Sequence, residues 1–304
     1  MAQKTLIVVV GPTAIGKTAL AIALAKHFQT EIISADSRQF FTEMSIGTAK
    51  PSEEELAAAP HHFINSHSVT QLFSTGDFEI QALALMEKLF AKHDVLIMVG
   101  GSGLYINAIC NGLDDMPEID LNIREQLNQQ FVDEGIEPIR KQLAELDPEY
   151  FSKVDQSNPQ RMIRGLEVVL STGQKLSSFL TSNKKERPFN IIKVGLNTDR
   201  EKLYNQINHR VDVMIENGLV EEVKSLEAYI NLNALKTVGY SEIFDYLDGK
   251  TDLATAIDKI KQNTRRFAKR QLTWFRKDTE TTWFEPAQDE EVITFVNQNL
   301  LRDN

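Results

Sequence analysis

Gly11-Pro12-Thr13-Ala14-Ile15-Gly16-Lys17-Thr18 directly follows the apolar run from Thr5 to Val10 and matches the pattern G-x-x-x-x-G-K-[ST]. The glycines let the backbone fold so that successive N–H groups point inward, where they can bind phosphate oxygens. In this pattern the lysine reaches the outer phosphate, and the hydroxyl of Thr18 can hold a magnesium ion. The residues after the loop are expected to form a helix, whose positive N-terminal end faces the anion. The stretch therefore predicts a phosphate-binding loop between a strand and a helix.

The type of phosphate compound is not decided by this loop. Most such loops bind nucleoside triphosphates, and those sites usually recruit an acidic residue at the end of another strand to help hold magnesium. The candidate strand, residues 94–99, ends at Val99 where that carboxylate would be expected, and Gly100-Gly101 follow. A nucleoside triphosphatase is therefore less favoured but remains an alternative.

Short β-branched apolar runs at residues 5–10, 31–35, 94–99 and 190–196 alternate with segments of helical periodicity. This alternation predicts an α/β fold, a P-loop-type parallel sheet flanked by helices. Ligands of such sheets bind beyond the carboxyl ends of the strands. We therefore expect three loops to converge there: the glycine loop, residues 36–39 and residues 100–105.

Residues 115–187 lack the strand pattern and predict an all-helical insertion domain within a core domain formed by residues 1–114 and 188–304. Helices are expected over 121–134 and 138–146, and another begins at Ser157-Asn158-Pro159, a cap residue followed by proline. The apolar face of this last helix is expected to hold Met162, Leu166, Val169 and Leu170. Its polar face is expected to hold Gln160, Arg161, Arg164 and Glu167, with solvation as the default interpretation.

Composition indicates an ordinary globular protein, with 42% hydrophobic and 25% charged residues in 304. No apolar run is long enough to cross a bilayer and no signal-peptide pattern is present, so we expect a cytoplasmic location and no membrane partner. The single Cys110 excludes an internal disulfide and a cysteine-rich zinc module, and we expect it to be a buried thiol. No coiled-coil repeat or pairing strand stands out, so a monomer is expected.

A local basic segment contrasts with the net charge of −10, which by itself argues against a nucleic-acid partner. Residues 261–277 contain seven basic and no acidic residues, interleaved with Phe267, Trp274 and Phe275. On a helix, Arg266, Lys269 and Arg270 share one face. Nucleic-acid contact and a solvated helix face are both open from this segment alone, and the core is the expected place for Trp274 and Phe275.

Two other groups of residues leave alternatives open. Arg210 flanks an apolar helical stripe formed by Leu203, Ile207 and Val211, so it projects into a site or lies along the surface. The histidines at 61, 62 and 67 do not predict a metal site, because adjacent side chains of an extended chain point in opposite directions. Packing and loop hydrogen bonds are the expected roles of these histidines.

Further motifs follow the glycine loop in a fixed order. They are Asp36-Ser37-Arg38-Gln39, Gly47-Thr48-Ala49-Lys50-Pro51, Pro60-His61-His62, residues 100–105, Asn158-Pro159-Gln160-Arg161, Val238-Gly239-Tyr240-Ser241-Glu242 and residues 264–276. Together with the loop they closely resemble the tRNA dimethylallyltransferases, also called tRNA isopentenyltransferases, over nearly the whole chain. A single cysteine cannot form the zinc finger of the eukaryotic relatives, so the resemblance is to the compact bacterial type.

The resemblance implies transfer of a dimethylallyl group from dimethylallyl diphosphate to N6 of adenosine 37, in tRNAs that read codons beginning with U. The glycine loop would then hold a prenyl diphosphate instead of ATP. Asp36 is implied as the general base, although a carboxylate at this position could instead hold magnesium or cap a helix. Thr13 and Lys17 are implied as the other catalytic residues, and Thr18 as the ligand of Mg²⁺. The implied diphosphate-binding residues are Gly11, Pro12, Thr13, Ala14, Ile15, Gly16, Lys17, Thr18 and Arg210.

The implied tRNA contacts lie in several segments. They are Asp36, Ser37, Arg38, Gln39, Ser102, Arg124, Gln160, Arg161, Met162, Ile163, Arg164, Arg266, Lys269 and Arg270. The chain departs from the family pattern at Ile15, usually serine, at Phe41, usually tyrosine, at Ser102, usually threonine, and at Gly165, usually alanine. None of these removes an implied catalytic group, although Ile15 and Phe41 leave two hydroxyl contacts in question.

Two alternatives remain open from the residues. A small-molecule or nucleoside kinase of the P-loop class would share the loop and the strand-end carboxylate but would not explain the basic segment. A non-catalytic, nucleotide-gated RNA-binding module would explain the basic segment but would leave Asp36 without a role.

Overall fold

A computed structural model describes residues 3–181 and 183–302 of the chain. Its contacts divide the chain into two compact units. The core unit comprises the residues up to Cys110 and those from Glu186 onward, and the helical unit comprises Asn111–Lys185. The sequence placed these boundaries at residues 115 and 187, a few positions further along the chain.

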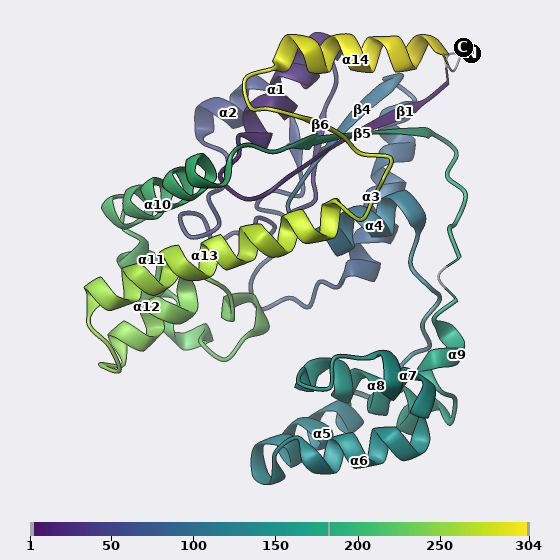
Figure 1. Cartoon of the computed structure of the whole chain (residues 1–304), viewed down its shortest axis with the longest axis vertical. Coiled ribbons are helices and arrows are strands. Elements are labelled where there is room, and N and C mark those ends of the chain that lie inside the picture. Colours follow the sequence, from purple (N-terminus) through teal and green to yellow (C-terminus); the bar gives the residue numbers. More distant parts are fainter. Residues whose placement is uncertain (1–2, 182, 303–304) are drawn as a thin grey trace. The chain divides into compact units, whose positions relative to one another are not determined.

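The core unit is built on a six-stranded sheet whose strands are all parallel (Figure 1). β1 (Thr5–Val10) lies between β4 (Val95–Val99) and β5 (Asn190–Leu196). β2 (Ile32–Ser34) and β3 (His61–His62) lie beyond β4, and β6 (Thr282–Phe284) lies beyond β5. The predicted α/β fold with a parallel sheet is confirmed. The sequence missed β3 and β6, because neither His61–His62 nor Thr282–Phe284 forms a β-branched apolar run.

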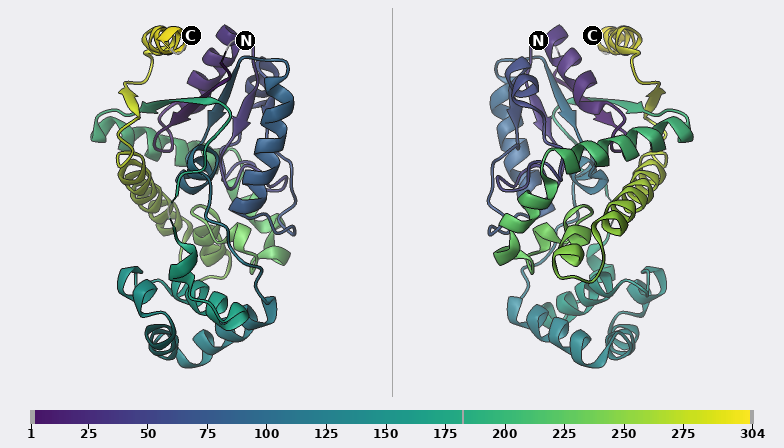
Figure 2. Two further views of the ribbon diagram at one scale, coloured as in Figure 1. Left: turned by 90° about the vertical axis from the view of Figure 1, so that its right-hand side faces the viewer. Right: turned by 90° about the vertical axis from the view of Figure 1, so that its left-hand side faces the viewer.

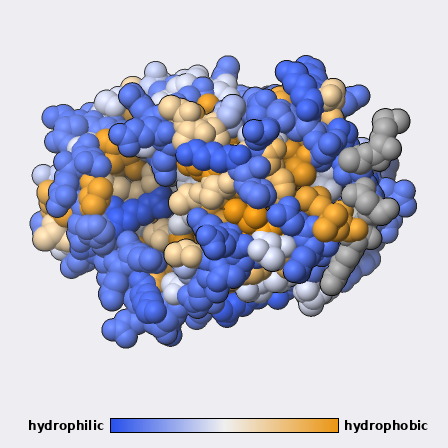
Figure 3. Space-filling view, turned by 90° about the horizontal axis from the view of Figure 1, so that it is seen from above, coloured by the Kyte–Doolittle hydropathy of each residue, from blue (hydrophilic) through white to orange (hydrophobic). Residues whose placement is uncertain are grey.

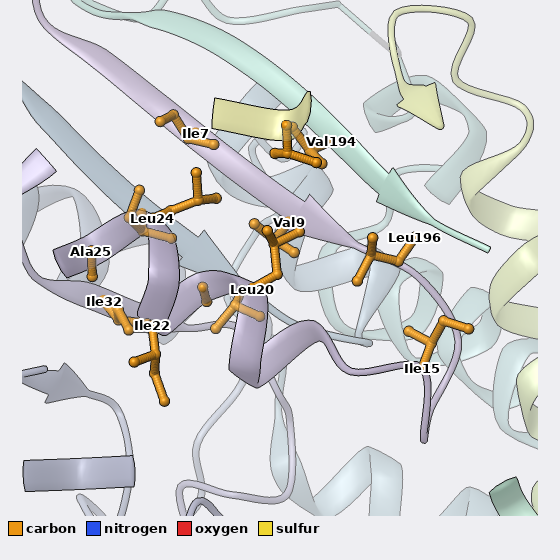
Figure 4. Close-up of a cluster of buried hydrophobic side chains, with 14 of the residues drawn as sticks. Ile7, Val9, Ile15, Leu20, Ile22, Leu24, Ala25, Ile32, Val194 and Leu196 are labelled. Carbon is orange, nitrogen blue, oxygen red and sulfur yellow. The ribbon is translucent and has the colours of Figure 1, made fainter. Parts of the chain in front are cut away.

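Alternate residues of β1 contribute to hydrophobic clusters on the two faces of the sheet. Ile7 and Val9 belong to a cluster with α1 (Lys17–Phe28), α10 (Arg200–Glu216) and α14 (Asp289–Arg302), part of which is shown in Figure 4. Leu6 and Val8 belong to a cluster with α3 (Thr75–Phe90) and α4 (Gly103–Asn111). Figure 2 shows the sheet between these helices. All four side chains are fully buried, and each such burial is worth about 1.5–3 kcal/mol.

A further group of helices completes the core unit around a third hydrophobic cluster. It contains α11 (Leu219–Ser225), α12 (Tyr240–Leu247) and α13 (Leu253–Phe275), and α13 packs along α10 and α12 (Figure 1). Short 3₁₀ turns at Glu227–Tyr229 and Asn233–Leu235 connect α11 to α12. The short helix α2 (Glu53–Ala58) begins at a capping box formed by Ser52 and Glu55.

One expectation for α13 is wrong. Phe275 is buried as predicted, but Trp274 is 45% exposed. The indole covers Gly103 at the start of α4, where a Cβ atom would lie 2.3 Å from the Trp274 ring. Because Gly103 has no side chain, Trp274 packs over it at the surface of the core unit instead of in the hydrophobic core.

The helical unit contains α5 (Leu121–Glu134), α6 (Glu137–Leu146), α7 (Pro148–Lys153), α8 (Pro159–Thr172) and α9 (Leu176–Phe179). Its hydrophobic core includes Leu127, Ile139, Leu143, Met162 and Leu166. The start of α8 is as predicted, because the side chain of Asn158 accepts the N–H of Arg161 at 3.2 Å and proline occupies the first turn.

The predicted faces of α8 need two corrections. Glu167 was placed on the solvated face but is fully buried, and Leu170 was placed on the apolar face but is 46% exposed. Glu167 is buried because the guanidinium group of Arg124 donates to both of its carboxylate oxygens, and Arg164 donates to one of them. Buried charges occur in proteins mainly when paired in this way. Leu170 is exposed because Leu166 is the last α8 residue in the hydrophobic cluster of the helical unit.

Along the described part of the chain, no helix combines the length and apolar character needed to cross a membrane. Figure 3 shows a face covered largely by hydrophilic residues, with hydrophobic residues exposed in patches between them. Cys110 is buried, as expected, and burial raises the pKa of its thiol to about 11. A thiol with so high a pKa is unreactive at neutral pH.

Candidate active site

The glycine loop connects β1 to α1 and leaves the first turn of α1 without a side-chain cap among the described residues. Gly16 is the N-cap residue and adopts a left-handed conformation, with φ of 97°. Gly11 passes so close to β5 that a Cβ atom would lie 2.6 Å from the carbonyl oxygen of Leu196. Only glycine permits both arrangements without strain. The uncapped N–H groups and the positive end of α1 make this turn suitable for an anion.

Two basic side chains accompany the loop without an acidic partner. Lys17 and Arg210, which lies on α10, form no ion pair within 4.0 Å with any described acidic side chain. Nζ of Lys17 donates to the carbonyl oxygen of Pro12 at 2.7 Å, and Nη1 of Arg210 lies 3.4 Å from the hydroxyl oxygen of Thr13. Burial, with Arg210 nearby, lowers the pKa of Lys17 to about 7. Burial also lowers the pKa of Arg210. Both side chains would gain from an anionic ligand.

A cavity of about 440 Å³ lies beside the loop. The ends of three neighbouring strands meet there, and the convergence of their loops is as expected from the parallel sheet. Its walls include Thr13 to Ala19, Asp36, Gln39, Gly100, Gly101 and Arg210. Gly11 and Pro12 are not among the lining residues. Gly100 is required at this junction because a Cβ atom there would lie 2.3 Å from the carbonyl oxygen of Ala35.

Asp36 stands at the end of β2 and lines this cavity and a second one. Its carboxylate oxygen Oδ1 accepts the N–H of Arg38 at 2.9 Å, which closes a turn. Ser102 ties the same segment to the turn after β4, because its hydroxyl oxygen accepts the N–H of Ser37 at 3.0 Å. Gln39 donates from Nε2 to the carbonyl oxygens of Thr48 and Ala49 at 3.2 and 3.1 Å. The segment 36–39 is therefore held at several points, and Asp36 remains at the cavity wall.

The second cavity, about 230 Å³, adjoins the first, since both are lined by Thr13, Asp36, Thr48, Arg210 and Phe267. Its remaining wall is more apolar. Ile207, Val211 and Met214 of α10, Val238, and Ile260 of α13 contribute to it, together with Ser37, Arg38 and Ser102. One end of the combined space is thus cationic, the other is largely apolar, and a carboxylate lies at their junction.

Two residues with structural roles at this site were not assigned a role from the sequence. Glu222 on α11 accepts the N–H groups of Ser45, Ile46 and Gly47 at 2.7–3.0 Å, and its carboxylate also accepts the hydroxyl of Tyr240 at 2.6 Å. The other is Gln271 of α13, which bonds to two of the loops at the cavity. The bonds of Gln271, and those of Glu222 to residues 45–47, join segments far apart in the sequence, so spacing and periodicity could not predict them.

The three basic residues predicted to share one face of α13 are all exposed. Arg266, Lys269 and Arg270 do not line either cavity, but Phe267, on the same helix, lines both. Phe267 is 38% exposed, and the guanidinium carbon of Arg270 lies 5.7 Å from its ring centre. The helix therefore presents a basic surface with an aromatic ring at the cavity wall.

The other predicted RNA-binding residues belong to the helical unit and differ in exposure. Gln160 and Arg161 are exposed, and Arg164 is partly exposed. Met162 and Ile163 are buried in the hydrophobic core of the helical unit. Arg124 is engaged with Glu167, and this interaction raises the pKa of the guanidinium group.

Two positions that depart from the family pattern are apolar and buried. Ile15 belongs to the cluster shown in Figure 4, and Phe41 belongs to the cluster around Tyr240. Gly165 has no room for the usual alanine, because a Cβ atom would lie 2.8 Å from Leu143 and 2.9 Å from Tyr150.

The histidines make separate local contacts. His61 lines the larger cavity and bonds through Nδ1 to the carbonyl oxygen of Ala59 at 2.8 Å. His62 pairs with Glu31 at 2.6 Å, and the ring of His67 stacks on Phe73.

Comparisons with known proteins identify the family of the chain. The model of the IPP transferase family matches residues 39–278. A tRNA dimethylallyltransferase of Christiangramia forsetii is 59% identical over 92% of this chain and 93% of its own. One of Flavobacterium johnsoniae is 51% identical over 98% of this chain and 99% of its own.

Solved structures give the same result. The full-length tRNA isopentenylpyrophosphate transferase of Bacillus halodurans is 36% identical with a TM-score of 0.73, over 99% of this chain and 98% of that one. A eukaryotic dimethylallyltransferase acting on tRNA has a TM-score of 0.80 and 26% identity, over 97% of this chain and 77% of that one. The chain belongs to the IPP transferase family.

Proposed function

We propose that the chain is a tRNA dimethylallyltransferase. It transfers the dimethylallyl group of dimethylallyl diphosphate to N6 of adenosine 37, in tRNAs that read codons beginning with U. The observation that carries the proposal is the composition of the paired cavities. At one end, Lys17 and Arg210 form no ion pair with an acidic side chain of the described residues. Apolar side chains line the other end, and Asp36 lies between the two. The names of relatives and neighbours over nearly the whole chain support it.

The diphosphate is the leaving group, and its departure is favoured by the cationic end. When the allylic C–O bond breaks, its electron pair stays on the diphosphate oxygen, so negative charge grows there. Backbone N–H groups of the loop, Lys17 and Arg210 are aimed at this charge, and Thr13 offers its hydroxyl beside Arg210. Groups that bind the departing charge better than the intact substrate lower the barrier.

Asp36 takes the proton that the nucleophile must lose. The exocyclic amine of adenine is weakly nucleophilic because its lone pair is delocalised into the ring. As nitrogen forms its bond to the allylic carbon, one of its protons passes to the Asp36 carboxylate, which lies where both cavities meet. A positioned general base contributes about 10²- to 10⁴-fold in rate.

The cavity also fits a magnesium ion. Mg²⁺ prefers oxygen ligands and is usually bound through few protein groups together with substrate phosphates. Thr18 is among the residues that line the larger cavity, and its hydroxyl would hold the ion there. When bound, the metal adds positive charge beside the leaving diphosphate.

The tRNA reaches the cavity by contacts on the exposed basic face of α13. Arg266, Lys269 and Arg270 bind phosphates of the anticodon stem-loop. In the helical unit, the exposed Arg161 and the partly exposed Arg164 are further RNA contacts. The target base leaves its stack to enter the pocket, as bases do in enzymes that modify them. We also infer that the enzyme acts as a monomer and that it is cytoplasmic. Sedimentation of the purified protein, alone and bound to tRNA, would test the monomeric state.

Product analysis tests the proposed reaction. The protein is incubated with dimethylallyl diphosphate labelled in the prenyl group, Mg²⁺ and undermodified tRNA, and the RNA is digested to nucleosides. We expect label in dimethylallyladenosine. A parallel reaction contains ATP labelled in the γ-phosphate, so that phosphorylation of any acceptor is visible. Transfer of phosphate from ATP without prenyl transfer would favour a kinase. Tight RNA binding without any transfer would favour a binding module. Either result would contradict the proposal.

A further inference from the structure

One amide side chain joins two of the loops that border the larger cavity. Oε1 of Gln271 accepts the N–H of Thr13 in the glycine loop at 2.8 Å. Nε2 of the same side chain donates to the carbonyl oxygen of Gly101, in the turn after β4, at 3.0 Å. Gln271 lies on α13 and is 6% exposed, and it lines the cavity itself. Three segments distant in the sequence therefore meet at this amide.

Both ends of the amide are needed for this arrangement. One end must accept from an N–H group and the other must donate to a carbonyl oxygen, and among uncharged side chains of this length only glutamine does both. The turn is shaped around it, because a Cβ atom on Gly101 would lie 2.3 Å from Nε2. A buried, hydrogen-bonded group of this kind holds its partners at fixed separation.

The hydrogen bond to Thr13 connects Gln271 to the groups proposed to bind the diphosphate. The main chain of Thr13 is held by Gln271, while its hydroxyl oxygen lies 3.4 Å from Nη1 of Arg210. A shift of Thr13 would therefore move a hydroxyl and the start of the loop relative to the cation at the cavity. Misplacement by about 1 Å can cost roughly 100-fold in rate.

From this geometry we infer that Gln271 is a positioning residue for prenyl transfer. It sets the place of Thr13, and with it the glycine loop, relative to α13 and the turn at Gly101. The inference rests on the proposed function and adds to it a residue that contacts loops of the site. Because Gln271 fixes the relative placement of groups at the site, its loss lowers kcat more than it weakens binding of either substrate.

Two substitutions separate the positioning role from a general effect on folding. Gln271→Met keeps the length of the side chain and removes both hydrogen bonds. Gln271→Glu keeps an acceptor for Thr13, loses the donor to Gly101 and adds negative charge at the cavity wall. Asn263→Leu is the matched control, because Asn263 is an α13 amide that bonds to Glu242 at 2.7 Å and lines neither cavity.

Three quantities are measured for each protein: kcat and KM for tRNA at saturating donor, the Kd for inorganic diphosphate by calorimetry, and the thermal midpoint. For Gln271→Met we expect kcat to fall at least tenfold, in the range of about 10- to 100-fold for a displaced site. KM for tRNA and the Kd for diphosphate should stay within threefold. For Gln271→Glu we expect the Kd for diphosphate to rise as well, because like charges repel. Asn263→Leu should lower the thermal midpoint without changing kcat.

An unchanged kcat in Gln271→Met would overturn the inference. The inference would also be overturned if Gln271→Met lost kcat, tRNA affinity and diphosphate affinity together, and if Asn263→Leu, with the same thermal midpoint, lost them to the same extent. If the wild-type protein does not prenylate tRNA, the proposed function fails on its own. The Kd for diphosphate, expected to stay within threefold in Gln271→Met, would then still show whether the diphosphate site survives loss of the Gln271 hydrogen bonds.

Discussion

Basic side chains have opposite surroundings in the two units of this chain. Beside the glycine loop, Lys17 and Arg210 are partly buried and form no ion pair with any described acidic side chain. In the helical unit, Arg124 and Arg164 share the carboxylate of Glu167, which is fully buried. Charges that are unpaired in the folded protein favour an external anion, whereas paired charges hold the fold together. The comparison therefore separates a binding site from a structural ion-pair network where the sequence shows only arginines and lysines on helices.

The largest effect is expected for Lys17→Met. Loss of a cation aimed at the leaving group should lower kcat by about 10²- to 10³-fold, as for other groups that stabilise developing charge. Because the pKa of Lys17 is lowered by burial, its removal should leave the unliganded protein equally or more stable. Single-turnover kinetics and equilibrium denaturation measure the two effects. If Lys17→Met had normal turnover and reduced stability, Lys17 would be a structural residue and not a ligand of the diphosphate.

Arg124→Met tests the other side of the comparison. It leaves Glu167 buried with Arg164 as its remaining partner, so we expect the free energy of unfolding to fall by about 2 kcal/mol. Arg161→Met, at an exposed position on α8, is the control and should change stability by less than about 0.5 kcal/mol. Urea denaturation of both variants gives the answer. Equal stability of the two would mean that the ion pair with Arg124 is not structural.

The basic face of α13 is expected to give a smaller effect. The double variant Arg266→Ala and Arg270→Ala should weaken tRNA binding by about tenfold and reduce the slope of log K against log salt by roughly one to two. Lys88→Ala with Lys92→Ala removes the same charge from exposed positions at the end of α3 and serves as the control. Filter binding at several salt concentrations measures both slopes. If the two double variants behave alike, α13 is only a solvated helix face.

The smallest effect concerns a proton. The pKa of Lys17 is about 7 in the free protein and about 10.5 unperturbed, so at pH 8 the side chain is largely neutral. A bound diphosphate favours the charged form, so binding should take up close to one proton. The same lowered pKa means that the unfolded state binds more protons between pH 7 and 10.5, so this group makes stability rise with pH.

Calorimetry of diphosphate binding in buffers of different ionisation enthalpy measures this uptake at pH 8. In Lys17→Arg the side chain stays charged at all pH values, so diphosphate binding to this variant should lack the proton uptake that comes from Lys17. Equal proton uptake by the two proteins would show that Lys17 is already charged before the ligand binds.

The sequence predicts the parts of the site that depend on local order. The strand Thr5–Val10, the glycine loop and the start of α1 follow from one contiguous pattern, and the start of α8 follows from Asn158-Pro159. The convergence of three loops follows from the rule for parallel sheets. These features need only neighbours along the chain, or the general geometry of the fold.

Features set by tertiary contacts were missed or predicted wrongly. Glu167 is buried because an arginine from another helix pairs with it, and Trp274 is exposed because Gly103 gives it a surface to cover. The bonds of Gln271, and those of Glu222 to the main chain of residues 45–47, join residues 170 or more positions apart. Neither helical periodicity nor residue type contains this information, because it depends on which elements pack together.

The central claim is that the unpaired cations hold a prenyl diphosphate while Asp36 receives the proton of the attacking amine. The most direct measurement is the intact mass of an anticodon stem-loop after incubation with dimethylallyl diphosphate, Mg²⁺ and either the wild-type protein or Asp36→Asn. We predict that the wild-type protein adds one C₅H₈ unit at adenosine 37. The variant should do so about 10²- to 10⁴-fold more slowly. An RNA of unchanged mass with the wild-type protein, or equal rates for the two proteins, would contradict it.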